Sequence, residues 1–134
     1  CLGTDTPGGT GVIPRGMFKN ILFLTSICGL STGQAIAIAT GNTARAHGLD
    51  CGILDINRPA DIVICGPVKG STGSSFSDAI EHGDFPGITH VLVDGIPVVL
   101  GRSHQTPPPQ NPAKFLCCNL GWISGHGAST HNLK

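Results

Sequence analysis

The sequence predicts an α/β fold: one strand–loop–helix unit, two further helices and then a small β module. Three observations lead to this prediction. A short apolar stretch runs into a Gly/Pro-rich loop at residues 3–11, apolar residues then recur at helical spacing, and from Leu49 onward the pattern changes to that of short β-strands. One β/α unit is too little for a closed barrel, so we expect a large apolar surface that further chain would cover.

The first helix is expected over residues 14–28. Pro14 suits the first helical position because its missing N–H would be unpaired there in any case. Gly29 is a typical residue just beyond a helix end. The apolar side chains between them have the spacing of a helix with one buried face, and they are Met17, Phe18, Ile21, Leu22, Leu24, Ile27 and Cys28.

Two shorter helices should follow. Ser31 or Thr32 caps a helix over residues 33–40, whose Ala and Ile residues make it apolar on all sides and therefore buried. Asn42 caps a third helix over residues 43–47. The helix faces that would need a missing barrel to pack on are those at Met17, Ile21, Leu24 and residues 35–39.

The next part of the chain predicts a β module with one helix. Residues 61–65 form a short β-branched strand, and residues 77–82 form a short helix. Residues 90–100 form a hairpin whose Asp94-Gly95 pair is a preferred two-residue turn. The connecting segments are a loop over residues 66–75 and a Pro-rich, extended stretch over residues 106–112.

Composition excludes several classes of protein. The eight basic and eight acidic residues balance to a net charge of zero, and with five Phe, one Trp and no Tyr there is no basic, aromatic surface for nucleic acid. No stretch reaches the roughly 18 apolar residues of a membrane helix, so we expect no membrane partner. The six cysteines are scattered without a CxxC pair, which favours buried, reduced thiols and a cytoplasmic protein.

Asp5 has the most chemical interest, because it stands where the expected first strand ends and its loop begins. In parallel β/α barrels, catalytic groups project from that end of a strand. A carboxylate there can bind a metal ion and accept a proton from water. The local sequence by itself also fits a simple Asx turn before Pro7.

The loop after Asp5 contains Gly8, Gly9 and Thr10, which we expect to bind substrate. Glycines let the backbone approach a ligand closely. Their N–H groups can face a carboxylate, and Thr10 can donate a hydrogen bond. A phosphate-binding loop is the rival interpretation, but no Gly-Lys-Ser/Thr follows these glycines.

Four segments, in the same order, resemble the metal-dependent amidohydrolase superfamily. They are Gly3-Thr4-Asp5, residues 39–49 (ATGNTARAHGL), residues 52–64 and residues 91–99. The resemblance implies the C-terminal fragment of a (β/α)8 TIM barrel, with its last strand and helices, plus part of a small β-sandwich domain. The implied division is residues 1–49 for the last β/α unit and closing helices, 50–105 for the β-sandwich, and 106–134 for a Pro-rich segment and irregular tail.

The resemblance also implies a site. Asp5 matches the aspartate that, in this superfamily, binds the metal and carries a proton from the hydrolytic water to the leaving nitrogen. The metal would be zinc or another divalent ion, in a binuclear centre of the full-length protein. The other family ligands are a His-x-His pair, a bridging Lys or Glu and two later histidines. They would lie upstream, and this chain contains no His-x-His.

The implied function is hydrolysis of a non-peptide C–N bond in a small cyclic amide. Residues 6–14 and 103–109 look most like superfamily members that hydrolyse a cyclic enamide. Since the chain begins at Cys1 and its only methionine is Met17, we expect part of a longer, homo-oligomeric enzyme. The chain would be inactive without its N-terminal barrel portion. The alternative is a catalytically inactive amidohydrolase-fold fragment or scaffold.

Other polar residues have structural interpretations. Arg45 and Asp61 are expected to satisfy backbone groups in a packed helix and at the start of a strand. The family has a Gly-Lys turn where this chain has Asn57-Arg58-Pro59, so Arg58 would serve as the basic residue. The histidines that are scattered without ligand spacing are His47, His82, His90 and His104.

The tail offers a rival zinc constellation. Its members are Cys117, Cys118, His126 and His131. Zinc favours such ligands, but adjacent cysteines fit poorly beside the usual C-x₂₋₄-C spacing. An unrelated C-terminal extension is therefore the favoured interpretation.

Overall fold

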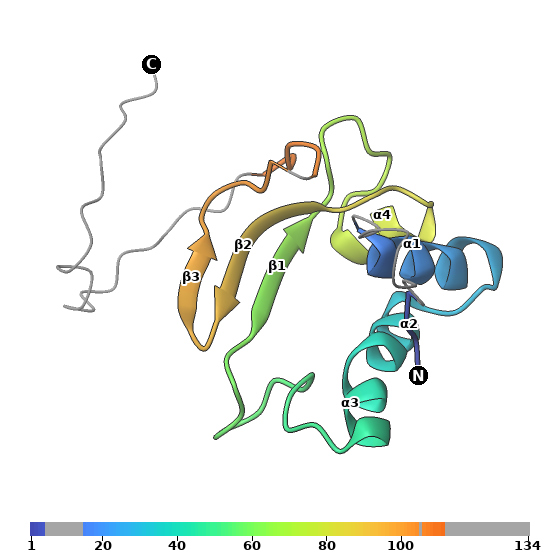
Figure 1. Cartoon of the computed structure of the whole chain (residues 1–134). Helices are drawn as coiled ribbons and strands as arrows, with labels where there is room; N and C mark the ends of the chain where they lie inside the picture. The colour runs from blue at the N-terminus through green and yellow to red at the C-terminus, as the bar shows by residue number, and fades with distance from the viewer. Residues whose placement is uncertain (5–14, 105, 112–134) are drawn as a thin grey trace, which may run out of the picture.

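The computed structural model describes residues 1–4, 15–104 and 106–111. Figure 1 shows short helices gathered on one side and a three-stranded sheet on the other. In chain order the elements are α1 (Gly16–Leu22), η1 (Phe23–Ile27), α2 (Thr32–Ala39), α3 (Gly41–His47), β1 (Ile62–Gly66), α4 (Phe76–Glu81), β2 (Gly87–Val93) and β3 (Ile96–Val99). The sheet is antiparallel with the order β1-β2-β3, and α4 lies with the other helices.

The first predicted helix is present, but its second half is wound differently. At Phe23, α1 passes into η1, a π-helical turn, and the N–H of Cys28 bonds to the Phe23 carbonyl, five residues earlier, at 3.1 Å. Two hydroxyl side chains, Thr25 and Ser26, donate to carbonyls of the preceding turn, and such bonds bend helices. Gly29, with a φ of 73°, ends the element as predicted.

The predicted second helix has a complete capping box. The Ser31 hydroxyl accepts from the Gln34 N–H, and the Gln34 side chain accepts from the Ser31 N–H. The cap predicted for the third helix is wrong. Asn42 lies inside α3, because the chain breaks at Thr40, whose φ and ψ are −117° and −94°. The Thr40 hydroxyl bonds back to the Ile36 carbonyl at 2.8 Å and caps nothing.

Ile80 of α4 completes the main hydrophobic cluster. It is fully buried against Ile21 and Leu22 of α1 and Ala35 of α2. The expectation that Ile21 and Ala35 need a missing barrel for cover is therefore wrong, because α4 covers them. Burial of α2 on all sides is also wrong: only Thr32 and Ala35 of this helix are buried.

Polar bonds fix α4 to the same helical layer. Glu81 accepts hydrogen bonds from the Thr32 N–H at 3.1 Å and from the Thr32 hydroxyl at 3.0 Å. A carboxylate at the start of a helix also interacts favourably with the helix dipole. The Thr25 hydroxyl lies 3.2 Å from the Ile80 carbonyl. α4 is therefore bonded to the start of α2 and to η1.

The predicted hairpin is confirmed. Asp94 and Gly95 join β2 to β3 with φ values of 48° and 76°, the left-handed pair that a type I′ turn requires. Asp61 accepts a hydrogen bond from the Asp94 N–H at 2.9 Å, so its structural interpretation is confirmed as well. Within the described ranges the strands form one sheet, and the second layer of a β-sandwich stays a prediction.

The turn at residues 57–59, where the sequence departs from the family pattern, has a backbone conformation typical of glycine. Asn57 has a φ of 63°, a left-handed conformation that asparagine adopts more readily than most residues. The next residue, Arg58, forms an ion pair with Asp50. The turn is therefore stabilised locally, without a glycine.

The expectations drawn from composition have mixed outcomes. Cys1, Cys28, Cys51 and Cys65 are free thiols, but Cys1 and Cys28 are exposed, so the expected burial is wrong for these two. Both lie outside the hydrophobic cluster, in an end segment and at the end of a π-turn. In the described part of the chain we find no helix with both the length and the apolar character that a bilayer crossing needs.

Gly73 should tolerate no side chain, because a Cβ there would lie 2.4 Å from the backbone nitrogen of Ala79 in α4. We expect Gly73→Ala to lower the free energy of unfolding by about 1–3 kcal/mol. Gly33→Ala is the matched control, since a Cβ at Gly33 in α2 would meet nothing within 4 Å. Alanine should stabilise that helix by about 0.5–1 kcal/mol. Denaturant unfolding of a protein that includes the expected N-terminal barrel portion measures both, and equal stabilities of the two variants would show that this close approach is unimportant.

Candidate functional site

Asp5, Gly8, Gly9 and Thr10 lie outside the described residues, so their assignment as catalytic, metal-binding and substrate-binding residues stays a prediction. The structure describes the backbone on both sides of this loop. Residues 1–4 lead into it, and α1 begins directly after it, with Arg15 as its N-cap. The part of the site that the structure describes therefore consists of the residues that contact the chain just before and just after the loop.

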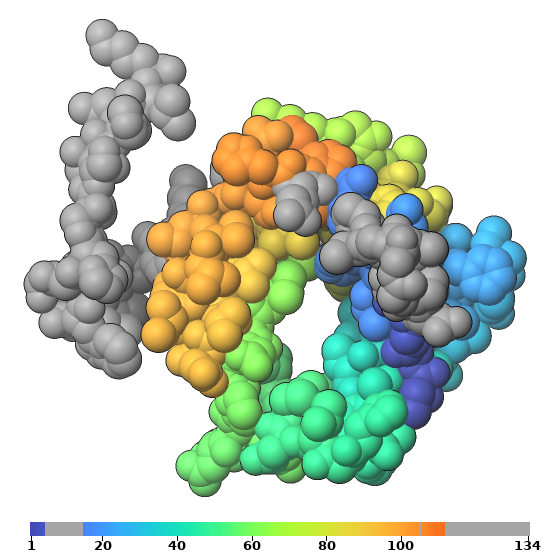
Figure 2. Space-filling view, in the orientation of Figure 1, coloured from blue at the N-terminus to red at the C-terminus, as the bar shows by residue number. Residues whose placement is uncertain are grey.

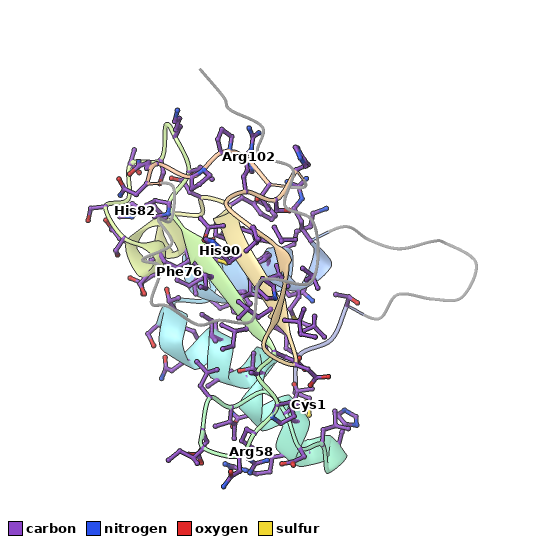
Figure 3. The ribbon with its side chains drawn as sticks, turned by 90° about the vertical axis from the view of Figure 1, so that its left-hand side faces the viewer. Cys1, Arg58, Phe76, His82, His90 and Arg102 are labelled. Carbon is purple, nitrogen blue, oxygen red and sulfur yellow. The ribbon has the colours of Figure 1, made fainter. Side chains whose placement is uncertain are left out.

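Two side chains hold the segment that leads to Asp5. Thr43, in α3, accepts a hydrogen bond from the Leu2 N–H at 3.1 Å. Asn20, in α1, donates from Nδ2 to the Gly3 carbonyl at 2.8 Å. The Leu2 side chain packs against the hydrophobic cluster. Figure 3 shows Cys1 at the end of the molecule where α3 lies, in agreement with these bonds.

The other end of the loop is held by an aromatic contact. The Arg15 guanidinium lies 5.1 Å from the centroid of the Phe85 ring, a cation–π geometry. Phe85 is itself packed against the hydrophobic cluster. Both ends of the predicted catalytic loop are thus attached to the same helical layer.

Asn20 carries no signal in the sequence, because it is one of several polar residues on an amphipathic helix. Thr43 lies within the motif at residues 39–49, but the motif alone does not say which of its residues faces the loop. Both were missed because their partners lie 17 and 41 residues away along the chain.

The described residues do not supply a complete metal site. Among them, no group of three or more His, Cys, Asp or Glu side chains could hold an ion. A catalytic zinc needs about three protein ligands, so a metal site at Asp5 would need ligands beyond those that the described residues supply. The rival constellation at Cys117, Cys118, His126 and His131 lies outside the described residues.

His82 interacts with a carboxylate. Its Nδ1 lies 2.7 Å from the Asp78 carbonyl and 3.1 Å from the Asp78 carboxylate, on the exposed side of α4. The hydrogen bond to that carbonyl and the Asp78 charge raise the pKa of His82. A hydrogen bond from the Ser74 N–H lowers the pKa of Asp78. This exposed pair completes the end of a helix, and a structural role accounts for it.

An apolar groove separates the helices from the sheet. Its volume is about 720 Å³, and Figure 2 shows it as the opening between the helices and strand β1. Asp61 is the one charged residue among those described that line it, and its carboxylate already accepts the Asp94 N–H. The groove is therefore a packing surface, with little polar chemistry of its own. Its apolar lining includes Met17, Phe18, Ile36, Ile53, Leu54 and Val63.

Comparisons with known proteins give one consistent result. Residues 1–98 match the Amidohydrolase family. Enamidase from Eubacterium barkeri is 39% identical over 114 residues, which is 85% of this chain and 29% of enamidase. The crystal structure of enamidase, described as a new member of the amidohydrolase superfamily, matches with a TM-score of 0.77 at 38% identity, over 82% of this chain and 28% of that one. The chain thus spans less than a third of the length of this relative.

Cys65 should react slowly, although it lines the groove. Burial raises the pKa of its thiol to about 11, and the thiolate is the reactive form. At pH 8 we expect iodoacetamide to modify Cys65 at least about 100-fold more slowly than an ordinary exposed thiol. Peptide mass spectrometry can compare it with the exposed Cys28 in the same sample. In denaturant the two rates should converge. Similar rates in the folded protein would contradict the burial of Cys65.

Proposed function

We propose that this chain, which belongs to the amidohydrolase family, is the C-terminal part of a metal-dependent hydrolase that cleaves a non-peptide C–N bond in a cyclic amide. The observation that carries the proposal is the 39% identity to enamidase over 85% of the chain. The structural likeness to enamidase fits a fragment of a barrel. In this proposal residues 1–49 form the last β/α unit and closing helices, and residues 50–105 contribute to a β-sandwich.

Asp5 is the proposed catalytic residue. It accepts the proton of the attacking water and passes it to the leaving nitrogen, so that the amine departs neutral. Gly8, Gly9 and Thr10 bind the substrate through backbone N–H groups and a hydroxyl. A divalent metal, with zinc as the first choice and a binuclear centre as the family precedent, supplies polarisation of the amide carbonyl and a lower pKa of water. Asp5 is one of its ligands, and the others come from the rest of the full-length protein.

The rest of the full-length protein is also the proposed partner for the groove. Enamidase is more than three times as long as the segment that matches this chain. The groove beside β1 is apolar, and Leu54 and Val63 on its wall are 74% and 52% exposed. Apolar surface of this kind is unfavourable in water. The full-length protein is proposed to be a cytoplasmic homo-oligomer, in agreement with the four free thiols among the described residues.

Substitution of Asp5 tests the proposed mechanism. The protein to use is the full-length enzyme, or a chimera in which this chain replaces the matching 29% of Eubacterium barkeri enamidase. We expect Asp5→Asn to lower kcat by about 10³-fold or more, since the variant can neither accept the proton nor bind the metal as a carboxylate does. The assay is hydrolysis of the enamidase substrate, with circular dichroism to confirm folding.

Asp55→Asn is the matched control, because Asp55 is an exposed residue whose carboxylate bonds only to the neighbouring Ile56 N–H among the described residues. It should keep normal turnover. Near-normal turnover of Asp5→Asn would overturn the assignment. A folded chimera that shows no activity before any substitution would favour the inactive scaffold.

The isolated 134-residue chain should associate with itself and bind no catalytic metal tightly. Its uncovered groove favours association, and one carboxylate cannot replace a set of three ligands. Sedimentation velocity should show oligomers or aggregates, and zinc titration should show no stoichiometric binding. A monomer that unfolds cooperatively and binds one zinc would contradict both expectations and point to the cysteines and histidines of the tail.

A further inference from the structure

We propose that residues 106–110 (TPPPQ) form a strap that holds α4 in its docked position, so that the strap, α4 and the loop before it open and close as one unit. Figure 1 shows the chain after β3 returning to the end of the sheet where β1 finishes and β2 begins. The loop between β1 and α4, residues 67–75, starts at the same place. This motion belongs to the fold and does not depend on the proposed reaction.

The strap is hydrogen-bonded to the loop before α4. The Lys69 N–H donates to the Pro108 carbonyl at 2.9 Å. Gln110 makes two bonds, because its backbone N–H donates to the Pro67 carbonyl at 2.8 Å and its side chain donates to the Ser71 carbonyl at 3.2 Å. These bonds join the strap to the start of the loop, as a fourth, short strand would be joined to a sheet.

The strap also contacts the chain that follows α4. The Thr106 hydroxyl, in a residue only 4% exposed, accepts the Ile88 N–H at 3.0 Å. At Gly87 the strap passes directly over the backbone. A Cβ there would lie 3.1 Å from the Pro107 carbonyl oxygen and 3.2 Å from the Pro109 nitrogen. The strap therefore holds the chain on both sides of α4.

The loop passes this restraint on to the helix itself. The Ser71 hydroxyl donates to the Asp84 carboxylate at 2.7 Å and accepts the Gly73 N–H at 3.0 Å. Gly73 lies so close to Ala79 that a Cβ would meet its nitrogen at 2.4 Å. α4 has only six residues, and a helix of that length is unstable by itself in water. Its docked position therefore depends on these contacts.

The three prolines of the strap explain why it can act as one piece. Proline fixes φ and has no N–H, so residues 107–109 favour an extended form that loses little entropy when it is ordered. The strap can then bond to its surroundings only through its carbonyls and through the residues at its two ends. Segments with few bonds of this kind open locally at lower free energy than the rest of a protein.

Two glycines that face each other test the strap. Gly66 and Gly87 are partners across β1 and β2, but a Cβ at Gly66 would meet nothing within 4 Å. We would introduce Gly87→Ala, with Gly66→Ala as the matched control, into the full-length protein or the enamidase chimera. Hydrogen exchange measured by mass spectrometry at single residues then reports three N–H groups, those of Lys69, Thr32 and Gly95.

Each of these N–H groups reports one contact. Lys69 reports the strap, and Thr32, which donates to Glu81, reports the docking of α4. Gly95 donates to the Ala60 carbonyl at the opposite end of the sheet and serves as the internal control. In Gly87→Ala we expect Lys69 and Thr32 to exchange at least about 10-fold faster, with Gly95 unchanged. In Gly66→Ala all three rates should stay as they are in the unsubstituted protein.

Loss of a single strap bond should have the same effect. Thr106→Val removes the acceptor of the Ile88 N–H at nearly constant shape, so Lys69 and Thr32 should again exchange about 10-fold faster. Thr106→Ser keeps the hydroxyl and should restore most of the protection.

The coupling should also work in the reverse direction, from α4 to the strap. Ile80→Val removes one methyl group from the buried face of α4 and is mild enough to leave the fold intact. It should quicken exchange at Thr32 by about 3–10-fold. If the strap and α4 open together, Lys69 should quicken by a similar factor, because coupling between two sites is reciprocal.

Three results would overturn the strap. Faster exchange at Lys69 without a change at Thr32 in Gly87→Ala would show that the strap moves without α4. Unchanged exchange at Lys69 in Ile80→Val, where Thr32 is faster, would show that α4 moves without the strap. Equal acceleration at Gly95 would show a loss of global stability in place of local opening. None of these results bears on Asp5, whose role is tested by turnover.

Discussion

The packing of α4 against α1 and α2 is the contact on which the rest of the described structure depends. α4 lies between β1 and β2 in the sequence, so its docking ties the sheet to the helical layer. The contact combines a fully buried side chain, Ile80, with the bonds from Glu81 to Thr32 and from Thr25 to the Ile80 carbonyl. The direct connection between the two parts, residues 49–61, is largely exposed and adds little packing.

That contact also determines where the loop with Asp5 begins. Burial of Ile21 beneath α4 sets the rotation of α1, and Asn20 then faces the Gly3 carbonyl. Burial of Ala35 fixes α2 in the same way, and the break at Thr40 places Thr43 beside Leu2. Packing in the cluster thereby fixes the backbone of Leu2 and Gly3, which precede the proposed catalytic residue in the sequence.

Local sequence signals predicted the elements well, because their physical causes are local. Gly29 and the Asp94-Gly95 pair take left-handed conformations that few other residues adopt, so they ended a helix and formed a turn where expected. The π-turn and the Thr40 break were missed, since they depend on hydroxyls that compete for carbonyls within a sequence of helical pattern. The docking of α4 was missed because it joins residues far apart in the chain.

The candidate site also has one part that the sequence indicates and one part that only the structure shows. The motif around Gly3 identified Asp5 and the family, and the match of residues 1–98 confirms the family. The roles of Asp5 and of the loop glycines remain proposals, since those residues lie outside the described ranges. Asn20 and Thr43 emerged only from the structure, because no pattern in sequence relates a side chain to a backbone group 17 or 41 residues away.

In the proposed function, the rest of the full-length protein both covers the exposed edge of the sheet and supplies further metal ligands. The two edges of the sheet show why such a covering segment is needed. β3 contains Pro97, which lacks an N–H and discourages further pairing. β1 has neither proline nor charge, and Val63 and Ile64 are 52% and 45% exposed beside the groove. An unprotected apolar edge is unfavourable in water, so this edge requires a covering segment. In the proposed function, Asp5 likewise needs further metal ligands. Both would come from a part of the full-length protein that corresponds to enamidase beyond the matched 29%, so loss of that part would remove stability and catalysis together.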